Sequence, residues 1–285
     1  MATILDGKRC AAALRAEAAM KVAQILEEEG VQVKLAVVLI GSDPASEIYV
    51  KYKHQDCKTC GIESLDIRLG GDVSQSEVLD LVDKLNADES VHGILVQLPL
   101  PAHLNKELIL ERIDPAKDVD GFHENNLGRL VRGQDALRAC TPMGIMRLLD
   151  YCDIDVAGKE AVVVGRSVIV GKPMALLLLE KNATVTIAHS ASKNLEELCS
   201  RADIVVSAVG KPEFIGKKHI KKGAVVIDVG MNRNAEGKLC GDVNYAEVEP
   251  LSSAITPVPG GVGPMTRAQL MLNTVRACEI ILGIG

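Results

Sequence analysis

A tyrosine and a lysine four residues apart are the first residues whose types and spacing could do chemistry. Tyr49 and Lys53 fall in a segment expected to be a helix over residues 44–60, with Pro44 in its first turn and Gly61 at its end. Residues four apart lie on one helix face, so the phenol and the amine would project together. A lysine kept partly neutral by burial can act as a base; an exposed lysine beside a half-buried tyrosine is the alternative.

Polar groups that follow apolar segments supply further candidates. Gln97 ends an apolar strand expected over residues 93–97, and Asp118 and Asp120 lie in a loop that ends at a glycine. Polar residues at the carboxyl ends of parallel strands commonly form the sites of α/β proteins. The two carboxylates could bind a metal or cap a turn, and turn capping is the interpretation that we favour.

A glycine loop lies between an apolar strand expected over residues 161–164 and a helix expected over 173–181. Its glycines are Gly165 and Gly171. Strand, glycine loop and helix can hold a dinucleotide pyrophosphate, because glycine lets the backbone approach closely and a helix N-terminus offers free N–H groups. The spacing is not G-x-G-x-x-G, and tight turns also favour glycine, so the loop alone leaves both interpretations open.

The residues around this loop favour NADP over NAD. Arg166 follows the strand directly and Lys172 precedes the helix. The next strand ends at His189 and Ser190, without the Asp or Glu that binds an unphosphorylated ribose 2′-hydroxyl. Arg166 with Ser190 suits a 2′-phosphate, so we expect NADP.

A run of Pro and Gly over residues 256–265 is almost stripped of large side chains. Such a segment either exposes backbone groups to a flat or large ligand or links two domains.

The eight cysteines are scattered singly, apart from Cys57 and Cys60. A structural zinc site uses four ligands, usually two such pairs, and no second pair exists, so we predict no metal site. The pair could be redox-active, but two buried thiols on a helix is the interpretation that we favour.

Composition excludes several classes of protein. The net charge is -6, aromatic residues make up 2% and there is no Trp, which disfavours nucleic-acid binding. No segment approaches the roughly 18 apolar residues of a membrane span. The N-terminus has no uninterrupted apolar stretch typical of a secretory signal, so we expect a cytoplasmic protein with no membrane partner.

Helical and strand patterns alternate along the chain, which predicts an α/β fold with mostly parallel sheets flanked by helices. Helices are expected over residues 9–29, 44–60, 74–86, 173–181, 194–201 and 267–282, and strands over 34–40, 64–69, 93–97, 161–164, 184–188, 203–208 and 224–229. Thr141 and Pro142 resemble a helix N-cap followed by the first helical residue, and they mark a domain boundary. We predict one domain over residues 1–140, joined by the C-terminal helix 267–285, and a Rossmann-like dinucleotide-binding domain over 141–266.

Nearly the whole chain resembles the bifunctional methylenetetrahydrofolate dehydrogenase/methenyltetrahydrofolate cyclohydrolase family. The matching motifs are YVKYK (49–53), GILVQLPLP (93–101), PAKDVDGF (115–122), CTPMG (140–144), GRSVIVGKP (165–173), NATVTIAHS (182–190), VIDVGMNR (226–233), GDV (241–243) and ITPVPGGVGPMT (255–266). The resemblance implies an NADP-linked oxidation of 5,10-methylenetetrahydrofolate followed by hydrolysis of the product. It also implies a homodimer that forms through the cofactor domains.

The resemblance further implies the roles of the folate-site residues. Lys53 matches the catalytic lysine, and Gln97 matches the glutamine that hydrogen-bonds it. Tyr49 matches the tyrosine that stacks on or orients the folate, and Asp120 the aspartate that holds the pterin ring. The loop that lines the folate pocket matches Pro259, Gly260 and Gly261.

For the cofactor, the resemblance assigns five residues. Gly165, Arg166 and Ser167 match the cofactor loop, and Ser190 lies near the adenosine phosphate. Met231 falls at a main-chain contact near the nicotinamide, where the family usually has Ile.

The chain departs from the family pattern in three places. Ala191 and Ser192 stand where relatives often have Lys or Arg and then Thr, Asn244 replaces a frequent Asp, and Arg267 replaces a frequent Val. We expect neither Asn244 nor Arg267 to touch the residues assigned to chemistry.

Two other functions stay open on the sequence. A monofunctional NAD(P) dehydrogenase of the same fold would need neither Lys53 nor Gln97, because hydride transfer requires only proximity and orientation. A non-catalytic nucleotide-sensing module would bind the cofactor without turnover.

Overall fold

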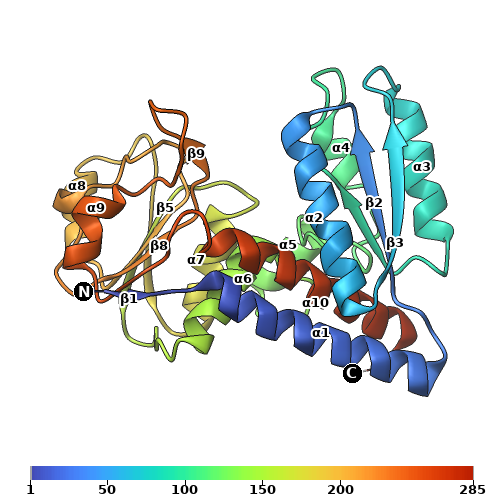
Figure 1. Cartoon of the computed structure of the whole chain (residues 1–285), viewed down its shortest axis with the longest axis horizontal. Helices are drawn as coiled ribbons and strands as arrows, with labels where there is room; N and C mark the ends of the chain where they lie inside the picture. Colours follow the sequence, from blue (N-terminus) through green and yellow to red (C-terminus); the bar gives the residue numbers. More distant parts are fainter. Residues whose placement is uncertain (1, 285) are drawn as a thin grey trace. The chain divides into compact units, whose positions relative to one another are not determined.

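The structure is a computed structural model that describes residues 2–284, apart from the side chain of Ala45. The chain divides into two compact units, whose elements are labelled in Figure 1. Unit 1 comprises Thr141–Thr266 and the residues up to Ala11, and unit 2 comprises Ala12–Cys140 and the residues from Arg267 onward. Among the described residues, no helix is long and apolar enough to cross a membrane.

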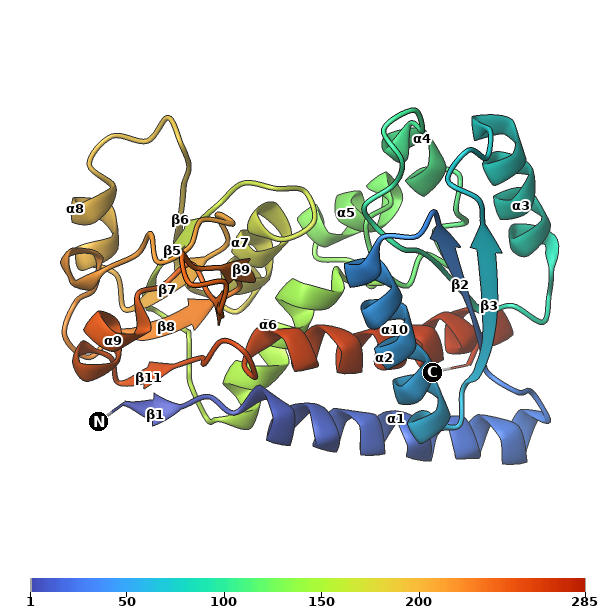
Figure 2. The ribbon, with the colours of Figure 1, turned by 45° about the horizontal axis from the view of Figure 1, so that its top comes forward.

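Unit 2 contains a three-stranded parallel sheet in the order β3-β2-β4. The strands are β2 (Lys34–Ile40), β3 (Glu63–Leu69) and β4 (Gly93–Val96), and Figure 2 shows β2 and β3 side by side. Every residue of β2 after Lys34 is buried, as expected for an apolar parallel strand covered on both faces. This arrangement confirms the parallel α/β prediction for this half.

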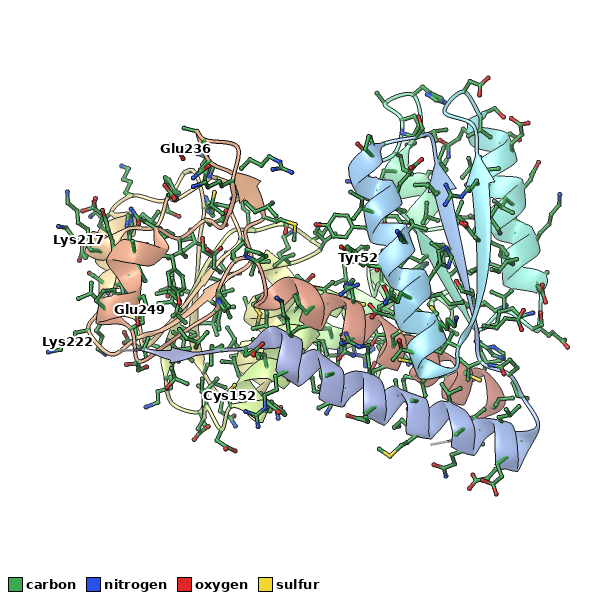
Figure 3. The ribbon with its side chains drawn as sticks, viewed as in Figure 1. Tyr52, Cys152, Lys217, Lys222, Glu236 and Glu249 are labelled. Carbon is green, nitrogen blue, oxygen red and sulfur yellow. The ribbon has the colours of Figure 1, made fainter. Side chains whose placement is uncertain are left out.

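The helix α2 (Pro44–Cys60) packs against β2 and β3. The Asp43 carboxylate accepts a hydrogen bond from Ser46 N at 2.8 Å, and Gly61 ends the helix with φ of 73°. The predicted bounds of this helix are confirmed, and Tyr52 is one of its exposed side chains (Figure 3). Other helices of unit 2 are α3 (Gln75–Ala87), α4 (Lys106–Leu110) and α5 (Glu124–Val131).

Unit 1 contains a six-stranded parallel sheet in the order β1-β11-β8-β7-β5-β6. Its strands are β1 (Thr3–Ile4), β5 (Glu160–Val164), β6 (Thr184–Ala188), β7 (Ile204–Ser207), β8 (Val225–Asp228) and β11 (Ala254–Ile255). The chain runs from β5 to β6 on one side and then to β7 on the other. The strand order therefore reverses at β5, and ligands bind at the carboxyl ends of strands beside such a point. The Rossmann-like prediction is confirmed.

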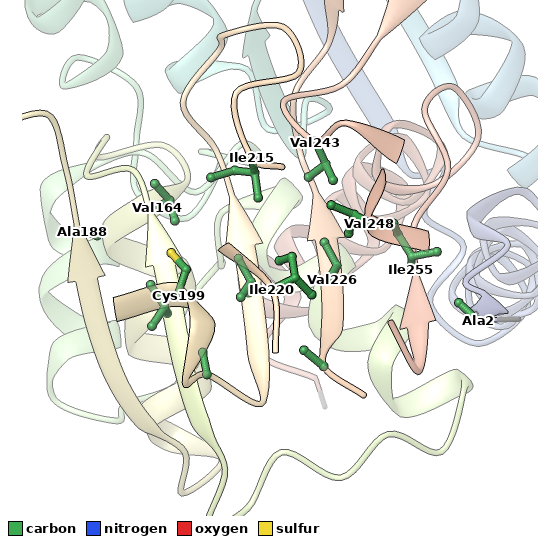
Figure 4. Packing of buried hydrophobic residues seen from close by; sticks show 14 residues of the cluster. Ala2, Val164, Ala188, Cys199, Ile215, Ile220, Val226, Val243, Val248 and Ile255 are labelled. Carbon is green, nitrogen blue, oxygen red and sulfur yellow. The ribbon is translucent and has the colours of Figure 1, made fainter. Parts of the chain in front are cut away.

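Apolar side chains from these strands pack against helices of the same unit. Figure 4 shows Val164, Val226 and Ile255 of the sheet in one cluster with Cys199 and Val248. The helices of unit 1 include α7 (Gly171–Glu180), which packs on β5 and β6, α8 (Leu195–Ser200) and α9 (Tyr245–Val248). Two short antiparallel strands are β9 (Asn232–Arg233) and β10 (Leu239–Cys240).

The predicted 1–140 domain differs from unit 2 at its start. The residues up to Ala11 belong to unit 1, because β1 pairs in parallel with β11 in the large sheet. A strand of two residues is too short to show a periodic pattern, so the sequence could not predict that β1 pairs with β11.

Several helices begin at other residues than we predict. The helix α1 spans Gly7–Glu29, and α6 (Cys140–Tyr151) begins before Thr141, whose hydroxyl lies 2.9 Å from that of Thr266 instead of capping the helix. The helix α10 spans Val262–Leu282, so it begins within the Gly and Pro run. Proline is tolerated in a first helical turn, and Pro264 therefore does not delay the start.

Two Gly→Ala substitutions are expected to change stability in opposite directions. Gly61 ends α2 with a φ of 73°, a conformation that costs an L-residue about 1 kcal/mol or more, so Gly61→Ala should lower the free energy of unfolding. Gly128 lies inside α5 with open space at its Cβ position, so Gly128→Ala should raise it by about 0.5–1 kcal/mol. Urea unfolding followed by circular dichroism measures both, and two changes of the same sign would contradict this.

Candidate active site

A lysine and a glutamine meet in unit 2. Lys53 Nζ of α2 donates a hydrogen bond to Gln97 Oε1 at 2.8 Å. Gln97 directly follows β4, and its backbone N–H bonds to Val38 O, so the sheet fixes its position. Its Nε2 donates to Leu98 O at 2.6 Å, which leaves Oε1 as the atom that faces the lysine.

Burial lowers the pKa of Lys53, because an ammonium ion is poorly solvated there. Asp120, Cys140 and Cys57 oppose this shift, and the positive charge of Arg267 adds to it. The amine therefore loses its proton more readily than an ordinary lysine, which is the property a base needs.

Asp120 lies beside this lysine. Burial raises the pKa of the Asp120 carboxyl to about 6, the Lys53 charge lowers that pKa, and Asp118 raises it. No donor from residues 2–284 makes a hydrogen bond to this carboxylate in the structure. Its oxygens are therefore available to the N–H groups of a ligand.

Neighbouring residues hold the loop that carries Asp120. The Asp118 carboxylate accepts hydrogen bonds from His123 N at 2.8 Å and from Asn126 Nδ2 at 3.0 Å. The turn-capping interpretation is therefore confirmed for Asp118. From α10, Asn273 Nδ2 donates to Val119 O at 2.8 Å. These bonds leave Asp120 on a well-supported backbone.

The face of α2 that carries Tyr49 and Lys53 also meets Arg267. The Arg267 guanidinium lies 4.8 Å from the centre of the Tyr52 ring and pairs with Asp56 Oδ2 at 3.2 Å. Burial raises the pKa of Tyr49, and the Arg267 charge lowers it. The contacts of Arg267 are therefore with Tyr52 and Asp56, and its charge also lowers the pKa of both Tyr49 and Lys53.

In unit 1, the glycine loop after β5 forms a cradle of backbone. Gly165 has φ of 135°, and a Cβ atom there would lie 2.4 Å from Ala208 O. A Cβ on Gly171 would lie 2.3 Å from Gly165 O. The Ser167 hydroxyl accepts hydrogen bonds from Val170 N at 3.2 Å and from Gly171 N at 3.3 Å. Only glycine fits at both positions, as a pyrophosphate site at the start of α7 requires.

The other predicted cofactor residues lie at the surface of unit 1. Arg166, Ser190 and Met231 are exposed. The strand β6 ends at Ala188, and no acidic residue follows it directly.

The predicted folate loop also belongs to unit 1, where its glycines allow close packing. Gly260 has φ of 113°, and a Cβ on Gly261 would lie 2.7 Å from Pro257 O. A Cβ on Gly7 would lie 1.8 Å from Gly261 O, so the start of α1 packs directly on this backbone. Pro259 is exposed.

Comparison with known proteins identifies the family. The family model described as tetrahydrofolate dehydrogenase/cyclohydrolase, catalytic domain, matches residues 5–120. The family model of the NAD(P)-binding domain of tetrahydrofolate dehydrogenase/cyclohydrolase matches residues 139–281. The chain belongs to the tetrahydrofolate dehydrogenase/cyclohydrolase family.

Individual relatives cover almost the whole chain. Bifunctional protein FolD from Ligilactobacillus salivarius is 54% identical over 279 residues, which are 98% of each protein. The crystal structure of the bifunctional enzyme FolD from Campylobacter jejuni is 48% identical, with a TM-score of 0.95 over 98% of this chain and 99% of that one. The Trypanosoma brucei FolD, complexed with NADP cofactor and inhibitor, is 36% identical, with a TM-score of 0.93 over 99% and 98% of the two chains.

The sequence alone assigns no role to three residues, Arg267 and the buried aspartates Asp228 and Asp242. The signal for Arg267 was its departure from the family pattern. For Asp242 the signal was the GDV motif (241–243), which carries a charged residue between a glycine and a valine.

The titration of Asp120 provides a direct test of this arrangement. Carbon-13 NMR of the labelled Asp120 carboxyl should show a midpoint at about pH 6, so the group is still largely protonated at pH 5. Lys53→Met removes a charge that lowers the pKa and should move the midpoint up. Asp118→Asn removes one that raises it and should move the midpoint down. A midpoint at the ordinary value near 3.8, or shifts in the reverse directions, would contradict the assignment.

Proposed function

We propose that this protein oxidises 5,10-methylenetetrahydrofolate to 5,10-methenyltetrahydrofolate with NADP and then hydrolyses it to 10-formyltetrahydrofolate. The observation that carries the proposal is the 2.8 Å hydrogen bond between Lys53 and Gln97. Hydride transfer requires only proximity and orientation, whereas hydrolysis requires proton transfer. A lysine of lowered pKa held by a neutral partner therefore favours the bifunctional enzyme over the monofunctional dehydrogenase, as do the FolD relatives.

The glycine cradle of unit 1 fits a dinucleotide. Gly165, Ser167 and the start of α7 would hold the pyrophosphate, because their backbone is open to close approach. Arg166 and Ser190 would bind the ribose 2′-phosphate, and Met231 would contact the nicotinamide through its main chain. When bound, NADP supplies the hydride acceptor for the oxidation.

In the hydrolytic step, Lys53 would take a proton from the water that adds to the methenyl carbon. Protonation of a ring nitrogen then lets the C–N bond break and leaves the formyl group. Gln97 fixes the amine without adding charge, so it does not restrain Lys53 from releasing or accepting a proton. A cationic substrate near the amine would lower its pKa further.

The remaining site residues would bind the folate. Asp120 would accept hydrogen bonds from the N–H edge of the pterin, and Tyr49 would stack on or orient the substrate. The backbone of the loop at Pro259, Gly260 and Gly261 would line the folate pocket.

We also infer that the protein forms a homodimer through unit 1. The strand β6 is an edge of the six-stranded sheet, and Ile187 on it is exposed. An exposed edge strand with apolar side chains is a ready surface for pairing with a second copy. A cytoplasmic location and the lack of a nucleic-acid partner remain predictions from the sequence.

Lys53→Met should separate the two activities. The variant should lose at least about a hundredfold of the cyclohydrolase rate, because methionine cannot transfer a proton. It should still bind NADP. The rates are measured by the disappearance of methenyltetrahydrofolate absorbance, with and without NADP and methylenetetrahydrofolate.

The matched control is Lys51→Met, which removes an exposed lysine from the same helix and should keep both activities. Full hydrolysis by Lys53→Met would mean that the role is misassigned. Formation of reduced NADP by the parent protein without any 10-formyl product would disprove the bifunctional proposal.

Arg166→Ala should alter the choice of cofactor. Loss of a charge-assisted hydrogen bond to a phosphate costs about 1.5–3 kcal/mol, so the KM for NADP should rise roughly ten- to hundredfold. The KM for NAD should change little. Initial rates with each cofactor measure this, with Lys181→Ala at the far end of α7 as the charge-matched control. Equal loss with NAD and NADP would contradict the assignment.

A further inference from the structure

Unit 1 contains a fully buried aspartate whose carboxylate is saturated with hydrogen bonds. Asp242 has no exposed surface. It accepts five hydrogen bonds, from Val209 N (2.7 Å), Asn232 Nδ2 (2.9 Å), Lys211 N (3.0 Å), Gly210 N (3.3 Å) and Ser207 Oγ (3.3 Å). In the described part of the chain, no lysine or arginine pairs with it. Backbone and amide N–H groups and one hydroxyl therefore compensate its burial.

A second buried aspartate holds the first. Asp228 accepts hydrogen bonds from Gly230 N, Asp242 N and Val243 N, each at 2.9 Å. A Cβ atom on Gly241 would lie 1.8 Å from Asp228 Oδ2, so only glycine fits at this position beside the carboxylate. Asp228 thus fixes the backbone of Asp242 and Val243.

The two aspartates bind the segments that leave the carboxyl ends of β7 and β8. Three of the donors to Asp242, from Val209 to Lys211, lie in the segment that follows β7 and Ala208. Asn232 follows β8, one residue after Met231. The same carboxylate therefore sets the position of two neighbouring loops at once.

These loops stand beside the point where the strand order reverses. Ala208, which precedes Val209, has its carbonyl oxygen so close to Gly165 that a Cβ there would lie 2.4 Å away. The residue that packs against the glycine loop therefore lies directly before the first backbone N–H that donates to Asp242. Dinucleotides bind at the carboxyl ends of strands beside such a reversal.

We propose that Asp242, held by Asp228, is a positioning residue for hydride transfer. It fixes the segments 208–211 and 230–232 against the bound dinucleotide, and this inference rests on the proposed function. A carboxylate accepts hydrogen bonds on both oxygens and donates none, which the five converging donors require. Lys53 and Gln97, which carry the hydrolytic step, bond to neither aspartate, so hydrolysis should not depend on this pair.

The test uses Asp242→Asn in the full-length enzyme. The amide group places an NH₂ against N–H groups that need an acceptor, so the two loops must shift. The kcat of methylenetetrahydrofolate oxidation at saturating NADP should fall at least tenfold. Hydrolysis of supplied methenyltetrahydrofolate, measured without NADP, should stay within twofold of the parent. Asn232→Ala removes one donor and leaves Asp242 intact, so it should lower oxidation several-fold even if Asp242→Asn does not fold.

The control is Asp203→Asn, which makes the same change at the opposite end of β7. Asp203 precedes that strand, accepts a hydrogen bond from Glu160 N and pairs with Lys221 at 2.7 Å. It should keep both activities. Parental oxidation by both Asp242→Asn and Asn232→Ala, or an equal fall of oxidation and hydrolysis, would overturn the inference. Absence of NADP reduction in the parent enzyme would instead overturn the proposed function.

Discussion

The hydrogen bond between Lys53 Nζ and Gln97 Oε1 depends on the small parallel sheet and in turn supports the chemistry. The glutamine can face the lysine because it continues β4, and the lysine reaches it from α2, which packs on the neighbouring strands. A charged partner in place of Gln97 would hold the lysine protonated, since an opposite charge raises the pKa of an amine. A neutral acceptor positions the amine and lets burial lower its pKa.

Long, regular elements of this fold could be predicted from the sequence because their signals are local. The bounds of α2 follow from a capping aspartate, a proline in the first turn and a glycine at the end. The two-residue strand β1 and the early start of α10 could not be predicted in this way. β1 exists only through its pairing with residues about 250 positions later, which no local pattern records.

The residues of the site also differ in whether local sequence patterns could identify them. Lys53, Gln97 and Asp120 could be proposed from their types and from motifs, and the structure brings these three side chains together. Arg267 could not be placed, because its effect on Tyr49 and Lys53 depends on how α10 packs beside α2. The role of Asp242 could not be predicted from the sequence for a related reason. Four of its five partners are backbone or side-chain groups more than 30 positions away in the sequence.

Two carboxylates of this chain, the fully buried Asp242 and the partly exposed Asp120, show how hydrogen-bond saturation separates binding from support. Asp242 uses both oxygens on protein donors, so a ligand could bind it only by displacing bonds that hold two loops. Asp120 accepts no such bond within the described residues, and burial raises its pKa to about 6. A carboxylate that is partly removed from water and has no protein donors is less well solvated than a free one, and a ligand with matching N–H groups supplies the missing hydrogen bonds. The unsatisfied aspartate is therefore suited to recognise substrate, and the saturated one to hold the protein that surrounds it.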